Sequence, residues 1–183
     1  MKFVPFVSMF LLALAACSGG HGDDQASHRA ANAFYNVYLK LHPSGVPTKN
    51  QQAEFKPLVS ADLAGLLVEA ALAEAHYAEA TKGEAPPLLE GDLFTSLFEG
   101  AESYKIGQCE MQKESWACAV ELAHTDSRDN SKVEWKDRIY VVRNKDRWAV
   151  DDIEFLGDWQ FMHKGRLKEL LKAVIAEGKN TPA

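Results

Sequence analysis

The chain has 183 residues, of which 46% are hydrophobic, and it carries 26 Asp and Glu against 20 Lys and Arg. This length and apolar content suffice for one buried core, so the composition indicates a single globular domain and excludes an intrinsically disordered chain. The net charge of -6 excludes a general attraction to nucleic acid or to an anionic membrane surface.

The N-terminal segment has the pattern of an export signal. Lys2 provides a positive charge, and the run from Phe3 to Ala16 contains no charged residue. A run of this length suits the apolar region of a signal peptide, whereas a transmembrane helix needs about 20 apolar residues. We therefore predict that residues 1–16 are a signal peptide.

The end of this segment, Leu14-Ala15-Ala16-Cys17, resembles the lipobox of bacterial lipoproteins. The resemblance implies that Cys17 is lipidated and becomes the new N-terminus, held in the membrane by several acyl chains. Ser18 stands where an aspartate is associated with inner-membrane retention, so the resemblance implies an outer-membrane lipoprotein that faces the periplasm. The alternative is an ordinary secretory signal that is cleaved near Ala16.

The first half of the mature chain is predicted to be helical. Residues 17–26 are polar and glycine-rich, which predicts a flexible tether before the domain. Apolar residues at three- and four-residue spacing then predict a helix over residues 28–41, which Pro43 and Gly45 end. A second helical segment surrounds Phe55 and Leu58. Ser60 is expected to cap a third helix that ends near Ala80.

The second half changes to a period of two, which predicts strands. Residues 82–100 are expected to be a connection with a short helical turn near Phe94 to Phe98. Short turns between four expected strands predict an antiparallel meander. The apolar positions that mark the four strands are, in order, Tyr104 and Ile106; Val120 and Leu122; Trp135, Ile139 and Val141; and Trp148 and Val150.

A final helix is predicted from an apolar stripe that faces the sheet and ends before Gly178: Leu167, Leu170, Leu171, Val174 and Ile175. Lys168 lies outside this stripe, so the Lys168→Asp substitution is expected to change stability very little. The predicted fold class is α+β, with N-terminal helices, a curved four-stranded antiparallel sheet and a C-terminal helix. The predicted domain spans residues 27–178, followed by a polar tail at 179–183.

Two cysteines constrain the sheet further. Cys109 and Cys118 lie at equal distances from a turn at Lys113-Glu114, so they are predicted to be cross-strand neighbours. In an oxidising periplasm such a pair is expected to form a disulfide, worth about 2 to 3 kcal/mol for a loop of about 10 residues. The alternative is a redox or metal site, although the Cys-x-x-Cys spacing typical of such sites is missing.

Three stretches resemble a group of proteobacterial lipoproteins that carry a domain of unknown function: Pro86 to Gly100 (PPLLEGDLFTSLFEG), Trp148 to Ile153 (WAVDDI) and Lys164 to Leu167 (KGRL). The order of helices and sheet is similar to the NTF2-like, cystatin-like class. This resemblance implies a cone formed by the sheet and helices, and an envelope location. It implies no particular reaction.

The acidic residues that an NTF2-like enzyme would need are Glu90, Asp92, Asp151, Asp152 and Glu154. Adjacent aspartates point to opposite faces of a regular strand, so Asp151 and Asp152 form a pair only if a bulge redirects one. The apolar parity shifts between Trp148-Val150 and Ile153-Phe155, which indicates such a bulge. We assign no catalytic residue, no metal site and no cofactor.

Trp159 and Phe161 follow Gly157-Asp158 at the end of the sheet, where loop aromatic residues mark either a cone mouth or a docking surface. Together with Asp151 and Asp152 they are the candidate ligand or docking residues. We therefore favour a non-enzymatic interaction module that is attached to the membrane through Cys17 and binds an envelope protein rather than nucleic acid. Small-molecule binding in an NTF2-like cavity and an NTF2-like enzyme remain the alternatives.

Overall fold

The computed structural model describes residues 19–159 and 163–182. Three helices come first: α1 (Gly19–Leu41), α2 (Lys49–Phe55) and α3 (Ala61–Ala80). Five strands follow, β1 (Ser103–Gln112), β2 (Ser115–Thr125), β3 (Lys132–Asn144), β4 (Arg147–Phe155) and β5 (Gly165–Arg166), and then α4 (Leu167–Asn180). The described part of the chain contains no helix that is both long and apolar enough to cross a bilayer.

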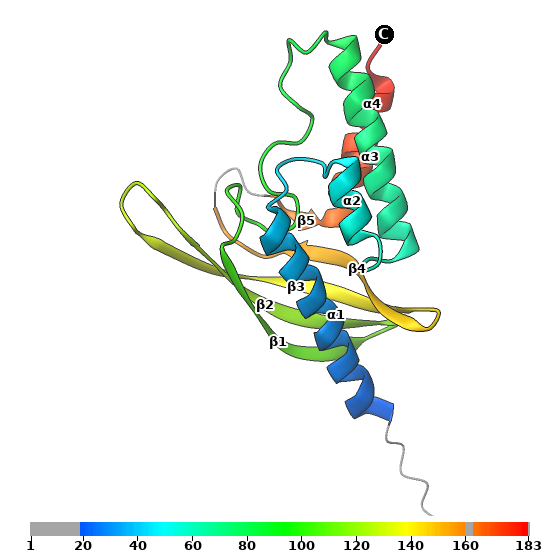
Figure 1. Cartoon of the computed structure of the whole chain (residues 1–183), viewed down its shortest axis with the longest axis vertical. Helices are drawn as coiled ribbons and strands as arrows, with labels where there is room; N and C mark the ends of the chain where they lie inside the picture. Colours follow the sequence, from blue (N-terminus) through cyan, green and yellow to red (C-terminus); the bar gives the residue numbers. More distant parts are fainter. Residues whose placement is uncertain (1–18, 160–162, 183) are drawn as a thin grey trace, which may run out of the picture.

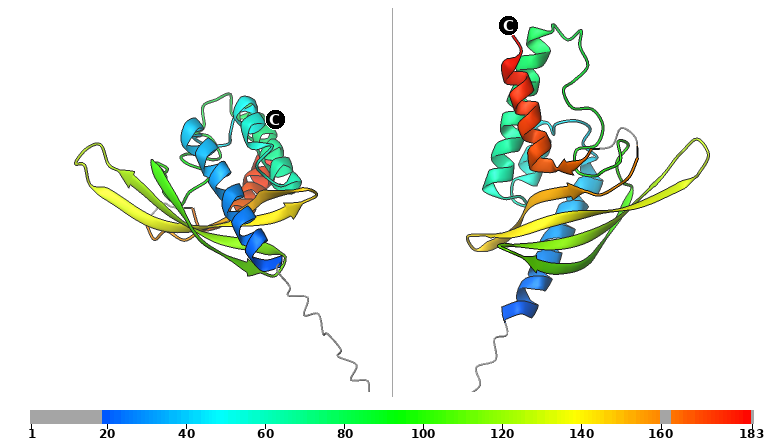
Figure 2. Two further views of the ribbon diagram at one scale, coloured as in Figure 1. Left: turned by 60° about the horizontal axis from the view of Figure 1, so that its bottom comes forward. Right: turned by 180° about the vertical axis from the view of Figure 1, so that it is seen from behind.

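The strands form one antiparallel sheet in the order β1-β2-β3-β4-β5. Helix α1 crosses one face of this sheet, and α3 and α4 lie side by side and project beyond its β4 edge (Figures 1 and 2). The predicted α+β class and the meander are confirmed. The strand count is wrong by one, because the two residues of β5 are too few to produce a period-two pattern.

The two faces of the sheet differ as the parity of the strands predicts. The inner face, toward α1, carries buried apolar residues such as Val120, Ile139 and Ile153. The outer face carries charged residues that pair across strands, with Glu121 bound by both Lys105 and Lys136. This one-sided burial fixes the register, because a slip by one residue would place the charges in the core.

The predicted bulge in β4 is confirmed. Tyr140 pairs with Asp152 and Val141 pairs with Val150, so Asp151 is the extra residue between them. After the bulge Ile153 and Phe155 return to the buried face. The parity shift in the sequence therefore reports a real change of side-chain direction.

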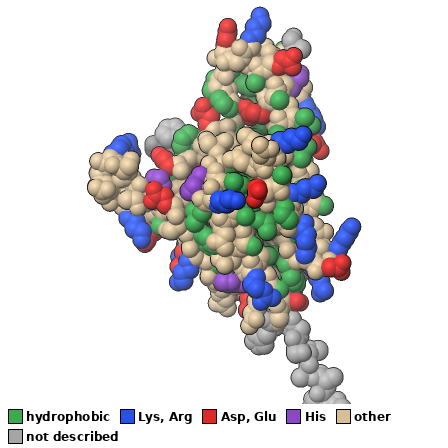
Figure 3. All heavy atoms as spheres, viewed as in Figure 1, with side chains coloured by type: hydrophobic (Ala, Val, Ile, Leu, Met, Phe, Trp, Pro, Cys, Tyr) green, Lys and Arg blue, Asp and Glu red, His purple; other side chains and the backbone are tan. Residues whose placement is uncertain are grey.

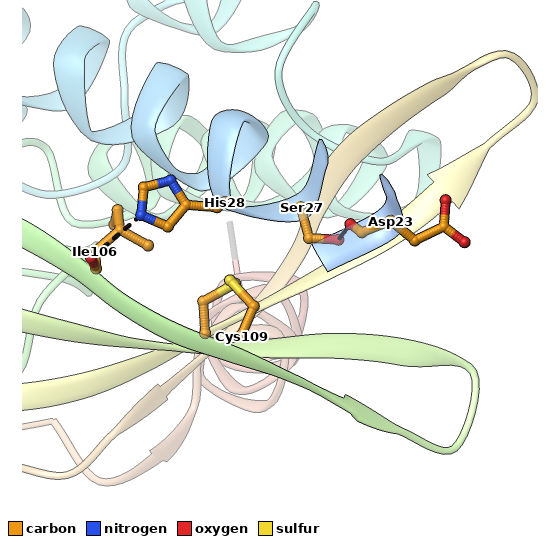
Figure 4. The surroundings of a disulfide bond; sticks show 6 residues. Asp23, Ser27, His28, Ile106 and Cys109 are labelled. Carbon is orange, nitrogen blue, oxygen red and sulfur yellow. Dashed lines mark hydrogen bonds between the residues drawn. A yellow bond between two sulfur atoms is a disulfide. The ribbon is translucent and has the colours of Figure 1, made fainter. Parts of the chain in front are cut away.

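The predicted disulfide is also confirmed. Cys109 and Cys118 are partners in the β1–β2 register, and their sulfur atoms are 2.04 Å apart. Gln112 faces Ser115 across the turn, where Lys113 has a φ of 57°. Figure 4 shows the disulfide beneath the first turns of α1, where His28 Nε2 donates to the Ile106 carbonyl at 3.3 Å.

Helix α1 starts earlier than predicted. It begins at Gly19, so residues 19–26, which we expected to be a flexible tether, are helical. The Ser27 hydroxyl donates to the Asp23 carbonyl at 2.8 Å, and Ser27 is fully buried. The helix includes Gly19, Gly20 and Gly22 despite their low helix propensity, and His28, just after this stretch, bonds to the Ile106 carbonyl in β1. Cys17 and the predicted signal peptide lie outside the described residues.

Helix α3 follows the prediction, whereas α4 departs from it. The Ser60 Oγ accepts from the Leu63 N–H at 3.0 Å and caps α3, which ends at Ala80. Helix α4 packs more extensively on α3 than on the sheet, and it continues past Gly178 to Asn180, so the expected polar tail starts inside a helix. A Cβ at Gly178 would lie 2.6 Å from the Ala73 carbonyl oxygen. This glycine therefore permits close helix packing and does not end the helix.

Candidate functional site

An open cleft of about 790 Å³ lies between the connection from α1 to α2, one flank of α3 and the loop that precedes β1. Four acidic residues contribute to its walls, and no Lys or Arg does: Glu74, Glu90, Asp92 and Glu99. The Phe98 side chain is 48% exposed at the same place. A concave site with convergent polar groups and an exposed aromatic ring is the typical form of a binding site.

Backbone contacts between the two loops shape this cleft. The Gly45 N–H donates to the Gly91 carbonyl at 2.6 Å, and Ser44 forms an isolated β-bridge with Asp92. Gly91 has a φ of 76°, and the Phe98 side chain occupies the space that a Cβ at this position would need. Glycine is therefore required where the loop folds back under the Phe98 ring.

Asp92 forms the floor of the cleft and is only 5% exposed. The Phe94 N–H donates to its Oδ1 at 2.8 Å, which makes a local turn. Burial raises the pKa of Asp92 to about 6, although hydrogen bonds from Tyr38, Phe94 and Thr95 favour the charged form. A carboxyl group that titrates near neutrality inside a cleft is a candidate functional group.

The surroundings of Asp92 are themselves ordered. The Tyr38 hydroxyl accepts from the Ala101 N–H at 2.8 Å, and burial raises the pKa of Tyr38 far above its usual range. His163 Nε2 donates to the Asp92 carbonyl at 2.9 Å, and burial lowers the pKa of this imidazole. Tyr38 therefore stays protonated and able to donate to the Asp92 carboxylate.

The Asp92→Asn substitution is expected to change how stability depends on pH. Native Asp92 keeps its proton up to about pH 6, whereas an unfolded aspartate has the ordinary pKa of 3.8 and loses its proton there. Between these values the native state binds more protons, so this group's contribution to stability falls as pH rises. Asparagine avoids the buried charge and still accepts from the Phe94 N–H. We expect the variant to gain up to about 3 kcal/mol over wild type at pH 7 and nothing near pH 4.

Urea unfolding at a series of pH values between 4 and 7.5 measures this difference. The control is Glu90→Gln, which removes an exposed carboxylate from the same cleft and should change neither stability nor its pH dependence. A difference between Asp92→Asn and wild type that stays constant over the whole range would contradict the raised pKa.

Besides Asp92, the interior contains a buried carboxylate that was not among the candidate residues from the sequence. Asp137 is 1% exposed on the inner face of β3. It accepts from the Ser96 N–H at 2.8 Å, the Ser96 hydroxyl, the Trp135 Nε1 at 3.1 Å and the Leu156 N–H at 2.9 Å. The sequence signal was its parity, because Asp137 alternates in step with the buried residues Trp135 and Ile139.

The Asp137 carboxylate binds a buried loop segment, residues 93–96, which we call the plug. Residues 93–96 lie between α1 and the sheet, and Leu93, Phe94, Thr95 and Ser96 are all fully buried. The expected helical turn near Phe94 is an irregular segment instead. Asp137 binds its Ser96, whereas the Phe94 N–H donates to Asp92 and the Thr95 hydroxyl donates to the Leu97 carbonyl. Protein side chains fill this part of the interior.

The two aspartates that we named as candidate ligand residues hold helices in place. Asp152 Oδ1 accepts from the Lys168 N–H at 3.1 Å, and Arg166 lies 3.4 Å from its Oδ2. Asp152 thus supplies the side-chain cap that Arg166, the N-cap residue of α4, does not provide. Burial raises the pKa of Asp152. Asp151 pairs with the Lys168 ammonium at 2.8 Å, so both carboxylates connect β4 to α4.

Of the two aromatic candidates, only Trp159 lies within the described residues. Its ring packs edge-to-face on Trp135 at 5.5 Å, so this side chain extends the cluster around Asp137. Phe161 falls outside the described residues. The acidic candidates Glu90 and Asp92 do line the cleft, whereas Glu154 pairs with Arg138 and Tyr140 on the outer face of the sheet.

Over the described ranges, no three His, Cys, Asp or Glu residues gather closely enough to hold a metal ion. Comparisons with protein families, with curated proteins and with solved structures find no match to this chain. The resemblances to lipoproteins and to the NTF2-like class therefore stay predictions, and the functional argument rests on the geometry of the cleft.

Proposed function

We propose that the protein is a lipid-anchored, outer-membrane binding module that engages an envelope protein through this cleft without catalysing a reaction. The observation that carries the proposal is the lining of the cleft, which combines four carboxyl-bearing residues with the half-exposed Phe98 and includes His42 but no Lys or Arg. A segment with Lys or Arg side chains and an apolar residue complements such a surface in charge and shape.

The roles of the buried carboxylates support binding over catalysis. Asp137 fastens the plug, and Asp152 caps α4, so hydrogen-bonding capacity that catalysis would need is used by the fold. We propose that the fold is a filled variant of the NTF2-like class. The support is the order of helices before a curved antiparallel meander, with the plug in the place of a cavity.

The proposed anchor suits this role. The lipobox-like Leu14-Ala15-Ala16-Cys17 ends just before α1, and the cleft begins at His42, just after α1 ends. The 23 residues of α1 span about 34 Å at about 1.5 Å per residue. Helix α1 therefore acts as a spacer that sets the cleft apart from the lipid on Cys17.

Photo-crosslinking in cells that naturally produce the protein tests this proposal. A photoreactive residue at Ser44, which lines the cleft, should give a discrete adduct with an envelope protein. Reversing two exposed charges of the cleft, with Glu90→Lys and Glu99→Lys, should reduce that adduct at least tenfold. The matched control reverses Glu110 and Glu114, which are exposed on the β1–β2 hairpin, and should leave the adduct unchanged.

The anchor is tested in the same cells. Cys17→Ala should abolish lipid labelling and move the protein from the outer-membrane fraction to the soluble periplasmic fraction. Unchanged lipid labelling would refute the anchor. No discrete adduct from Ser44, or equal adducts from the cleft and control reversals, would refute the binding role.

A small organic cation in the same cleft is the second candidate. It is favoured by the half-exposed Phe98 ring next to Asp92, since an aromatic face and a carboxylate together suit a cation with an apolar body. Native mass spectrometry of the purified protein would show such a molecule, and the Glu90→Lys and Glu99→Lys reversal should displace it.

A further inference from the structure

The wall of the cleft that α3 provides contains a carboxylate with one unused oxygen. Glu74 lines the cleft, and its Oε1 accepts from the Leu88 N–H at 2.9 Å. The second oxygen, Oε2, is buried and has no hydrogen-bond partner. Within residues 19–159 and 163–182, Glu74 takes part in no ion pair. Glu74 is therefore held in position by the loop and can still accept from a ligand.

An unpartnered carboxylate oxygen is unusual where water does not reach it. Buried polar atoms normally have a hydrogen-bond partner, and a buried charge is normally paired or bonded by donors. Glu90 and Glu99 add further negative charge to the same cleft, and no Lys or Arg lines it. Figure 3 shows acidic and hydrophobic side chains close together on the projecting part of the molecule that carries α3. A cationic group with N–H donors is thus the group that the cleft lacks.

We propose that Glu74 determines the specificity of the cleft, and that its Oε2 binds the ammonium group of a lysine side chain of the envelope partner. This inference rests on the proposed function, which it deepens by naming the residue that anchors the partner. A partner segment without a basic side chain at this point would leave Glu74 Oε2 buried and unpaired in the complex. Such an unpaired group is an effective way to reject a wrong partner.

The hydrogen bond from Leu88 favours an ammonium group over a guanidinium group. Arginine binds a carboxylate best through two parallel N–H bonds, one to each oxygen. Here Oε1 already accepts from the Leu88 N–H, so the second guanidinium bond would compete with a bond that holds the loop. An ammonium group is a compact charge with three donors, and a single oxygen is sufficient to bind it.

A lysine side chain also suits the lining of the cleft. Its four-carbon stem is apolar and flexible, so it can carry the charge to an oxygen that is withdrawn from the surface. Pro87, Leu89 and Phe98 line the cleft and offer apolar surface to this stem. An apolar residue of the partner would contact the same surface without pairing with Glu74.

Titration of the full-length, isotope-labelled protein in mild detergent tests the ammonium preference by nuclear magnetic resonance. The probes are n-butylammonium for lysine, n-butylguanidinium for arginine and n-butanol for the apolar stem alone. The Leu88 amide resonance reports on Glu74, because this N–H donates to its carboxylate. At constant ionic strength, butylammonium should shift this resonance with a dissociation constant at least fivefold lower than that of butylguanidinium. Butanol should leave the resonance unchanged.

Glu74→Gln tests the role of Oε2 itself. Glutamine keeps a carbonyl oxygen that can accept from the Leu88 N–H, but it places an uncharged amide group where Oε2 was. The affinity for butylammonium should fall at least tenfold, and circular dichroism with urea unfolding checks that the variant folds. The matched control is Glu69→Gln, which removes an exposed carboxylate from the same helix outside the cleft and should leave the affinity unchanged.

Equal affinity for the two cations, a Leu88 shift caused by butanol, or an affinity insensitive to Glu74→Gln would each overturn this inference. In cells, Glu74→Gln should also reduce the Ser44 adduct at least fivefold, whereas Glu69→Gln should not change it. An adduct that forms but does not respond to Glu74→Gln would overturn the lysine anchor and leave the binding role intact. Absence of the adduct, together with a Glu74-dependent ammonium shift, would overturn the protein partner and identify a small ammonium compound as the ligand.

Discussion

Replacing Asp137 with alanine is expected to lower the free energy of unfolding by about 3 to 5 kcal/mol. The carboxylate accepts from two backbone N–H groups, one hydroxyl and one indole N–H, all in the interior. Alanine leaves these donors without an acceptor, and each unpaired buried donor carries a desolvation penalty of about 1 to 3 kcal/mol. The loss should free the plug at Ser96 and loosen the contact between Trp135 and Trp159.

Urea unfolding followed by tryptophan fluorescence measures this effect. Asp137→Asn keeps one acceptor oxygen but turns an amide N–H₂ toward the remaining donors, so it should lose less than alanine and still lose more than 1 kcal/mol. Glu134→Ala is the control, because Glu134 is exposed on the same strand and should change stability by less than about 0.5 kcal/mol. An Asp137→Ala protein as stable as the control variant would show that the plug does not depend on this carboxylate.

The features that were predictable from sequence depend on neighbours along the chain. The α3 cap at Ser60 needs only three following residues, and the disulfide needs only equal spacing of Cys109 and Cys118 about a turn. The bulge at Asp151 was visible because one extra residue shifts the parity of every later side chain. In each case the local pattern and the tertiary structure agree, so local reasoning was sufficient.

The features that escaped prediction depend on contacts between distant segments. Gly178 reads as a helix end, and only the approach of Ala73 from α3 shows that it is a packing residue. Residues 19–26 read as a tether because they are polar and rich in glycine, and the sequence does not show that His28, just after them, bonds to β1. The cleft likewise brings together residues 42–46, α3 and residues 87–99, and no single stretch carries its pattern.

The residues nominated near the end of the sheet illustrate the same limit. Asp151 and Asp152 were recognised as unusual because of the bulge, yet the sequence does not show that α4 returns to them. Their partner Lys168 was expected to tolerate an aspartate. The structure places its ammonium between Asp151 and Asp62, at 2.8 and 2.6 Å, with the side chain only 16% exposed. We now expect Lys168→Asp to be destabilising, because it replaces two ion pairs with three neighbouring carboxylates.

The second large effect is expected at the apolar stripe of α4. Leu171 is fully buried between α4 and the rest of the core, whereas Leu170 is only partly buried. Leu171→Asp removes a packed side chain and introduces a carboxylate without a partner, so it should lower the free energy of unfolding by more than about 4 kcal/mol. Leu170→Asp should lose less, because its carboxylate reaches solvent. Thermal unfolding followed by circular dichroism distinguishes the two.

Two lysines on the same helix provide the controls that separate packing from charge. Lys172 is exposed, so Lys172→Asp should remain close to wild type, while Lys168→Asp should fall between Lys172→Asp and Leu171→Asp. Loss of helical signal in Leu171→Asp well below the melting temperature of Lys172→Asp would confirm that α4 is held by its buried stripe. Equal melting of the Leu171, Lys168 and Lys172 variants would mean that α4 does not pack on α3 as the structure shows.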